Sequence, residues 1–143
     1  IHGFEITGFS APINNMDAYV KANMELLNPD IRKELLGDKK LPVYTKTRED
    51  CPTKYGLQSE VKNSLIADGC IIEGKVENCI LFRGVKIGKG SVVKNSIIMQ
   101  STVIGENCDI KYLIADKDVT VSDESKLTGA ECNYFLIKKG GKV

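Results

Sequence analysis

The chain has 143 residues, with 20 Lys and Arg against 19 Asp and Glu and a formal net charge of +1. This length suits one domain, or a domain with an appendage, and it allows a sizeable core. The balanced charge indicates neither a nucleic-acid nor a membrane partner, and no apolar run approaches the roughly 20 residues that cross a bilayer.

Residues 1–13 read as one or two short strands, punctuated by glycine and proline. The chain opens on Ile1 and enters this segment directly, so we expect it to be a piece of a longer polypeptide. A helix follows. Asn14 is its expected cap, and Asp17 stands three residues later, in the position that returns a hydrogen bond.

A second short helix is predicted after Asn28. Asn is a good cap, Pro29 suits the first helical position, and Gly37 ends the helix. Residues 38–60 form a connector with a candidate strand at 41–45 and several extra Lys and Arg residues. We interpret this charge as a solvated face, with anion binding as the alternative.

Four similar phrases then follow at spacings of 15, 17 and 16 residues. They are Asn63-Ser64-Leu65-Ile66, Asn78-Cys79-Ile80-Leu81, Asn95-Ser96-Ile97-Ile98 and Lys111-Tyr112-Leu113-Ile114. Another aliphatic residue lies six residues after the end of each of the first three phrases. After the second and third phrases, a further aliphatic residue follows six residues later. These aliphatic residues are Ile72, Ile87, Ile104, Val93 and Ile110.

A period near six inside a period near sixteen fits neither a helix nor a simple strand alternation. It is the hexapeptide signature of a parallel β-helix, in which three short strands make one coil. The predicted fold class is therefore all-β with a helical appendage. The predicted domains are 1–60, with the strands, helices and connector, and 61–143, with the β-helix.

In such a fold the hexad aliphatics point into a prism and stack between coils about 4.8 Å apart. The glycines between them fall at corners, where a positive φ is often needed: Gly69, Gly74, Gly84, Gly88, Gly90 and Gly105. Asn63, Asn78 and Asn95 fall in register and are expected to form an internal amide ladder.

Five cysteines occur without a C-x-x-C pair. This pattern favours reduced thiols in the cytoplasm over disulfides or a zinc site. Cys79 occupies the position that Ser64 and Ser96 occupy in the neighbouring coils, so this position requires a small side chain. We interpret Cys70, Cys79 and Cys108 as packing residues. No secretory signal is visible.

Catalytic motifs are sparse. The stretch Gly69–Lys75 matches G-x-x-x-x-G-K, the start of a phosphate-binding loop, but Val76 follows in place of Ser or Thr. Many hexapeptide proteins are acyltransferases that use a histidine base, and here the one histidine is His2, outside the repeat. No Ser-His-Asp set and no His/Cys metal cluster occurs, so the predicted catalytic and metal residues are none.

The residues resemble the C-terminal part of glucose-1-phosphate adenylyltransferase (ADP-glucose pyrophosphorylase). The resemblance runs from Asp17-Ala18-Tyr19 through the stretch 63–74 to Ile114-Ala115-Asp116-Lys117. Val43-Tyr44-Thr45-Lys46, followed by Pro52-Thr53-Lys54-Tyr55, looks most like the GlgD-type subunit, the partner of the catalytic subunit in some bacteria.

The resemblance implies a left-handed β-helix and an N-terminal nucleotidyltransferase domain outside this chain. That domain makes ADP-glucose and pyrophosphate from ATP and glucose 1-phosphate, with Mg²⁺, for glycogen synthesis. The β-helix would act as a scaffold that binds a second copy or the catalytic subunit, and no cofactor is expected in this piece. The alternatives are the β-helix of another sugar nucleotidyltransferase or a related scaffold subunit, with an acyltransferase a distant third.

The resemblance also implies an effector site. Family effector lysines lie in the segment like Asp116-Lys117 and near the C-terminal strand, which carries over to Lys117 and Lys138. A sugar phosphate is the expected effector. The alternative interpretation of both residues is ordinary solvated lysine.

Overall fold

The computed structural model describes residues 2–3, 5, 8–37, 42–44 and 49–143. The chain divides into two compact units, Ile1–Arg48 and Glu49–Val143. The boundary between the two units lies after residue 48, whereas the repeat predicted a boundary after residue 60. The reason is that Lys54 and Tyr55 already form a strand that pairs with the β-helix.

The first unit contains two helices, α1 (Met16–Glu25) and α2 (Pro29–Leu36). Asn15 caps α1, because its Oδ1 accepts a hydrogen bond from Ala18 N–H at 2.7 Å. The expected cap, Asn14, was therefore wrong by one residue. Asn28 and Pro29 begin α2 as predicted, with Asn28 Oδ1 accepting from Asp30 N–H at 2.9 Å.

Arg32 of α2 satisfies carbonyl groups at the end of α1. Its Nη1 donates to Leu26 O at 2.6 Å and to Leu27 O at 2.8 Å. The last carbonyls of a helix have no partner within the helix, so Arg32 caps α1 and fixes the corner between the two helices.

The strands expected at 1–13 and 41–45 lie partly outside the described residues. The described positions among them, residues 2–3, 5, 8–13 and 42–44, form neither helix nor strand.

The second unit consists of three parallel sheets of five strands each. Sheet A contains β1 (Lys54–Tyr55), β4 (Ile71–Ile72), β7 (Lys86–Ile87), β10 (Val103–Ile104) and β13 (Thr120–Val121). Sheet B contains β2 (Glu60–Lys62), β5 (Lys75–Glu77), β8 (Val92–Lys94), β11 (Asp109–Lys111) and β14 (Lys126–Thr128). Sheet C contains β3 (Leu65–Ile66), β6 (Ile80–Leu81), β9 (Ile97–Ile98), β12 (Leu113–Ala115) and β15 (Phe135–Ile137).

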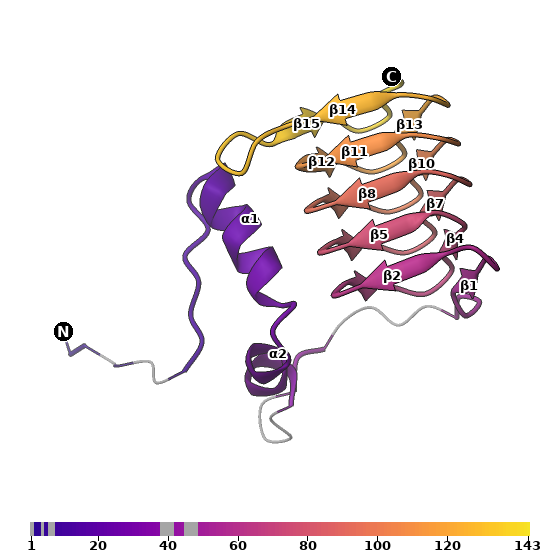
Figure 1. Cartoon of the computed structure of the whole chain (residues 1–143). Coiled ribbons are helices and arrows are strands. Elements are labelled where there is room, and N and C mark those ends of the chain that lie inside the picture. Colours follow the sequence, from indigo (N-terminus) through magenta and orange to yellow (C-terminus); the bar gives the residue numbers. More distant parts are fainter. Residues whose placement is uncertain (1, 4, 6–7, 38–41, 45–48) are drawn as a thin grey trace. The chain divides into compact units, whose positions relative to one another are not determined.

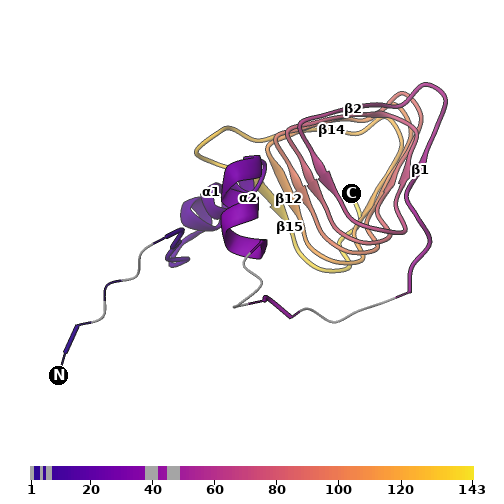
Figure 2. The ribbon, with the colours of Figure 1, turned by 90° about the horizontal axis from the view of Figure 1, so that it is seen from below.

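Successive strands of one sheet belong to successive coils, which stack one above another (Figure 1). Seen along the stack, the coils superpose as a triangle (Figure 2). Backbone groups bond between coils, as in Ile71 N–H to Val85 O at 2.9 Å and Lys86 N–H to Thr102 O at 3.0 Å. This arrangement is the predicted parallel β-helix.

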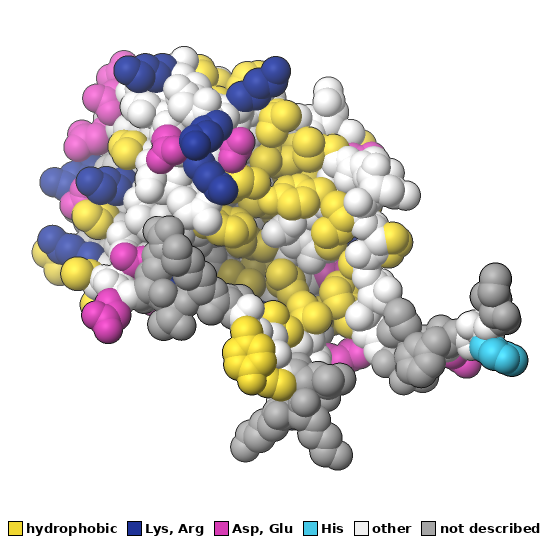
Figure 3. All heavy atoms as spheres, turned by 180° about the vertical axis from the view of Figure 1, so that it is seen from behind, with side chains coloured by type: hydrophobic (Ala, Val, Ile, Leu, Met, Phe, Trp, Pro, Cys, Tyr) yellow, Lys and Arg dark blue, Asp and Glu magenta, His cyan; other side chains and the backbone are white. Residues whose placement is uncertain are grey.

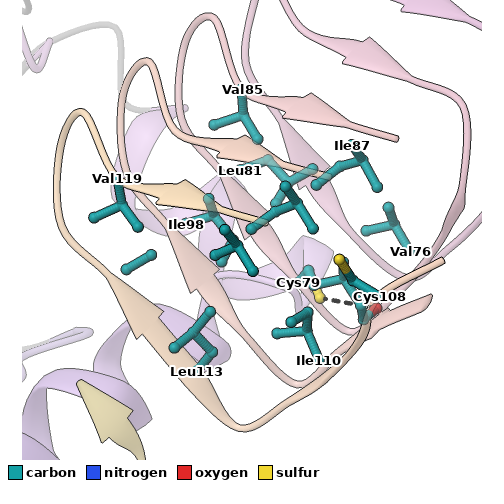
Figure 4. Packing of buried hydrophobic residues seen from close by; sticks show 14 of the residues in the cluster. Val76, Cys79, Leu81, Val85, Ile87, Ile98, Cys108, Ile110, Leu113 and Val119 are labelled. Carbon is teal, nitrogen blue, oxygen red and sulfur yellow. Dashed lines mark hydrogen bonds between the residues drawn. The ribbon is translucent and has the colours of Figure 1, made fainter. Parts of the chain in front are cut away.

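The predicted hexad residues fill the interior. Ile72, Ile87 and Ile104 stack in sheet A, while Val93 and Ile110 stack in sheet B, and none of the five is more than 1 % exposed. Figure 4 shows such side chains converging from several strands. Stiff, branched side chains suit this position because they pack well on a pleated surface.

The fourth phrase is displaced by one residue from its expected alignment. Ala115, not Ile114, stacks on Ile98 in the interior column of sheet C. Tyr112 consequently takes the corner position of the asparagines, with φ 53°. Asn favours this left-handed conformation and a bulky residue does not. Tyr112 was therefore not predicted to occupy this corner.

Asn63, Asn78 and Asn95 occupy corners with φ of 42°, 52° and 48°. Asn63 Nδ2 donates to Asn78 Oδ1 at 2.7 Å, so one link of the expected amide ladder forms. Asn63 is exposed, which places this link at the surface rather than inside. The left-handed backbone conformation, more than the amide ladder, therefore explains why asparagine occupies these corners.

Small hydroxyl and thiol side chains are buried next to the aliphatics. Ser91 Oγ donates to Gly105 O at 2.6 Å and accepts from Cys108 N–H at 2.9 Å, linking two coils. Cys70, Cys79 and Cys108 are buried as predicted. Burial raises the pKa of the Cys79 thiol to about 12, so this thiol remains neutral and serves as a packing group.

Candidate effector site

The two lysines expected to bind an effector lie in neighbouring coils, at the corner that joins sheets C and A. Lys117 follows β12 and Lys138 follows β15, and these strands pair with Ala115 opposite Ile137. Asp116 N–H donates to Ile137 O at 2.9 Å, so the two segments leave the sheet together. Both lysines are exposed.

A third lysine, Lys139, joins this corner and was missed from the sequence. Gly140 N–H donates to Lys117 O at 2.9 Å, which puts Lys139 next to Lys117 in the following coil. The sequence carried a signal, since Lys138-Lys139 follows an apolar strand as Asp116-Lys117 does. The paired residues Ala115 and Ile137 are 22 apart, however, well outside the repeat spacing.

Two acidic residues flank Lys117. The Asp116 carboxylate is engaged locally, because its Oδ1 accepts from Lys117 N–H at 2.7 Å. No described carboxylate forms an ion pair with the ammonium group of Lys117, Lys138 or Lys139. The corner thus presents three point charges that can contact an anion such as phosphate.

Gln100 lies at the same corner, one coil before Lys117, because Asp118 N–H donates to Gln100 O at 3.0 Å. Its side-chain Oε1 is buried and has no hydrogen-bond partner among the described residues. A buried acceptor without a partner calls for an explanation.

The stretch Gly69–Lys75 does not form a phosphate-binding loop. Gly69 is a corner with φ +74°, and Lys75 begins strand β5 rather than a helix. Elsewhere in the described part of the chain, no group of three or more His, Cys, Asp or Glu could hold a metal ion. None of the described helices is long and apolar enough to cross a membrane.

Basic and acidic side chains lie close together on one side of the face that Figure 3 shows, beside a broad area of hydrophobic side chains. On the face opposite that of Figure 1, Lys and Arg stand among Asp and Glu, with hydrophobic side chains beside them (Figure 3). This face shows no large patch of one charge sign.

Comparison with known proteins agrees with this architecture. Residues 51–132 match the family described as "GlmU-like, C-terminal hexapeptide", which is consistent with a left-handed β-helix. The "Glycogen biosynthesis protein GlgD" of Bacillus subtilis is 44% identical over 137 residues, which cover 96% of this chain and 40% of that protein.

Two proteins named "Glucose-1-phosphate adenylyltransferase" are also similar. The one from Clostridium perfringens (strain SM101 / Type A) is 35% identical over 101 residues, covering 71% of this chain and 26% of that protein. The one from Acetivibrio thermocellus is 31% identical over 126 residues, covering 87% and 29%. These similarities confirm the resemblance predicted from the sequence. The chain spans two fifths or less of the length of these three relatives.

Proposed function

Because the chain belongs to the GlmU-like C-terminal hexapeptide family, we propose that it is the assembly and regulatory domain of a glucose-1-phosphate adenylyltransferase subunit in glycogen biosynthesis. The observation that carries this proposal is the similarity to a GlgD protein over 96% of the chain. The hexapeptide match alone would also fit another sugar nucleotidyltransferase. The parent reaction converts ATP and glucose 1-phosphate to ADP-glucose and pyrophosphate, with Mg²⁺ bound outside this chain.

We expect the 143-residue chain alone to release no pyrophosphate from ATP and glucose 1-phosphate with Mg²⁺ present. Among its described residues no group of three or more His, Cys, Asp or Glu could hold a metal ion, and Gly69–Lys75 is part of the β-helix rather than a phosphate-binding loop. A coupled pyrophosphate assay measures this, with a complete glucose-1-phosphate adenylyltransferase as the positive control. Turnover at an ordinary enzymatic rate by the isolated chain would contradict the scaffold proposal.

The open N-terminal end of the β-helix supports an assembly role. Tyr55 and Val61 stand in interior register, opposite Ile72 and Val76, yet they are 53% and 37% exposed. Leu57, between their strands, is fully exposed. Unpaired strand edges and exposed apolar residues are usually covered in proteins. We propose that a second copy or a catalytic subunit covers this end, in the cytoplasm, where the five unpaired thiols remain reduced.

Lys117 and Lys138 are proposed to bind a sugar-phosphate effector together with Lys139. In the full-length assembly, Lys117→Ala is expected to raise the activator concentration for half-maximal effect about tenfold, because a lost charged hydrogen bond is worth roughly 1.5 kcal/mol or more. Substrate KM should remain nearly unchanged. Activator titration of the steady-state rate measures both quantities.

Lys86→Ala is the matched control, since Lys86 is an exposed lysine of sheet A in β7, away from this corner. It should leave the activator titration unchanged. If activation persists unaltered in the Lys117→Ala/Lys138→Ala double variant, the two lysines are ordinary surface residues.

A further inference from the structure

The outer face of sheet B carries charged side chains of both signs. The middle residues of β5, β8 and β11 lie in the core, Leu127 of β14 packs against it, and Val61 of β2 stands in the same register. The two flanking residues of each strand therefore point outward. Strands β2, β5, β8, β11 and β14 stack one above another (Figure 1), and their register aligns the outward residues in two columns along the stack. The first column is Glu60, Lys75, Val92, Asp109 and Lys126, and the second is Lys62, Glu77, Lys94, Lys111 and Thr128. We call these ten residues the charged face.

The charges of this face are held in place by ion pairs within the molecule. Lys62 and Lys75 contact the Glu60 carboxylate at 2.8 Å and 3.2 Å, and Lys94 contacts Glu77 at 2.6 Å. Hydrogen bonds from Lys62 and Lys75 lower the pKa of Glu60. These side chains remain between 40% and 65% exposed, so they are paired within the molecule and still accessible to a partner.

Three of the five rows contain one acid and one base. The order of sign reverses between the first row, Glu60 and Lys62, and the second row, Lys75 and Glu77. The fourth row, Asp109 and Lys111, has the order of the first, with the two groups 3.1 Å apart. The third row pairs Val92 with Lys94, and a groove of about 230 Å³ lies over rows one to three.

A two-fold axis parallel to the stack would bring this face onto itself with each row opposite its own copy and the columns exchanged. Glu60 then meets Lys62 of the second copy, and Lys75 meets Glu77 of the second copy. Asp109 likewise meets Lys111 of the second copy, while Val92 packs against the aliphatic part of Lys94. No two like charges oppose each other in this arrangement.

The other two-fold arrangement, with the axis along the strands, inverts the order of rows. It would also pair several opposite charges, such as Glu60 with Lys126 of the second copy. However, it places Lys94 directly opposite Lys94 of the second copy, near the axis. Like charges in contact disfavour an interface, so the arrangement with matched rows fits better.

We propose that the charged face of sheet B is a contact between two copies of this chain, related by a two-fold axis parallel to the stack. Strand spacing and rise give a face of about 240 Å² per copy, well below the roughly 800 Å² of a standard interface. The contact is therefore weak alone, sensitive to salt, and adds to other contacts of the assembly. It is independent of the enzyme-family proposal, which its failure would leave intact.

The test is sedimentation equilibrium of the 143-residue chain at low salt, about 0.05 M, and at high salt, about 0.5 M. We expect self-association that weakens at high salt. Glu60→Lys places a new ammonium group opposite Lys62 of the second copy, twice per dimer by symmetry, and should weaken low-salt association about fivefold or more. The double change Glu60→Lys/Lys62→Glu restores opposite charges across the contact and should recover association to near the original value.

Two further variants make the result specific. Asp68→Lys changes the charge by the same amount at the corner between sheets C and A, and it should not affect the salt-dependent association. Glu60→Lys/Lys126→Glu restores pairing only in the inverted arrangement, so it should not rescue. The proposal is overturned if Glu60→Lys has no effect, if Lys126→Glu rescues in place of Lys62→Glu, or if the chain is monomeric at low salt. Melting curves of each variant verify that folding is intact.

Discussion

Replacing Ile87 with Asp is expected to unfold the β-helix. Ile87 is 1% exposed and stacks between Ile72 and Ile104 of the neighbouring coils. An unpaired carboxylate there costs several kcal/mol, comparable with the roughly 5–15 kcal/mol that stabilise a typical domain. Circular dichroism during urea or thermal unfolding of the 143-residue chain measures the loss of stability.

Lys86→Asp provides the control in the same strand. Lys86 precedes Ile87 in β7 and is exposed on the outer side, so the same new side chain meets water there. Lys86→Asp should change the free energy of unfolding by no more than about 0.5 kcal/mol. Near-equal melting of the two variants would mean that the phase of the repeat is wrong.

The sequence predicted the interior well because a β-helix repeats one environment. Ile72, Ile87 and Ile104 recur at nearly constant spacing since each must fill the same place in successive coils. Capping predicted α2 equally well, because Asn28 and Pro29 each favour one backbone conformation. Structural requirements that are local or repeated can therefore be predicted directly from the sequence.

The prediction was poorer where a corner tolerates several residues. Tyr112 takes the place of an asparagine with φ 53° and packs edge-to-face on Tyr134, with ring centroids 5.6 Å apart. Nothing in the hexad pattern marks this exchange, so the fourth phrase was aligned one residue early. The same uncertainty of register concealed Lys139, which neighbours Lys117 only because Ala115 pairs with Ile137 across 22 residues.

The charged face shows a different limit. Each lysine and glutamate of sheet B looks like ordinary surface charge in the sequence. Their relation depends on which residues of successive coils stand side by side, as Glu60 and Lys75 do. The change of sign between neighbouring strands, as from Glu60 to Lys75 and from Lys62 to Glu77, becomes visible only once the register is known.

The corner glycines divide into two groups with different reasons. Gly69, Gly84 and Gly90 have positive φ, as expected from the sequence. Gly74, Gly88 and Gly105 do not, and a Cβ there would instead contact the backbone or Asp123 in the next coil. The same residue type thus meets two separate demands, conformation at one corner and close approach at another.

Gly88→Ala is therefore expected to destabilise the β-helix much more than Gly84→Ala. A Cβ at Gly88 would press against Gly105 O, with Gly105 C at 2.6 Å and Glu106 N at 2.8 Å. These are backbone atoms held between coils by hydrogen bonds, such as Gly88 N–H to Ile104 O at 2.9 Å. The coils would have to separate, which we expect to cost about 3 kcal/mol.

At Gly84 the nearest heavy atom to a new Cβ is Ser101 Oγ at 3.9 Å, and only the left-handed conformation opposes alanine. That strain amounts to about 1 kcal/mol. Ser101 and Asp118 occupy the equivalent corner in later coils with φ of 58° and 59°, so side chains are tolerated there. Urea unfolding of both variants compares the two free energies. Equal losses would show that conformation alone selects glycine at every corner, because close approach would then add nothing at Gly88.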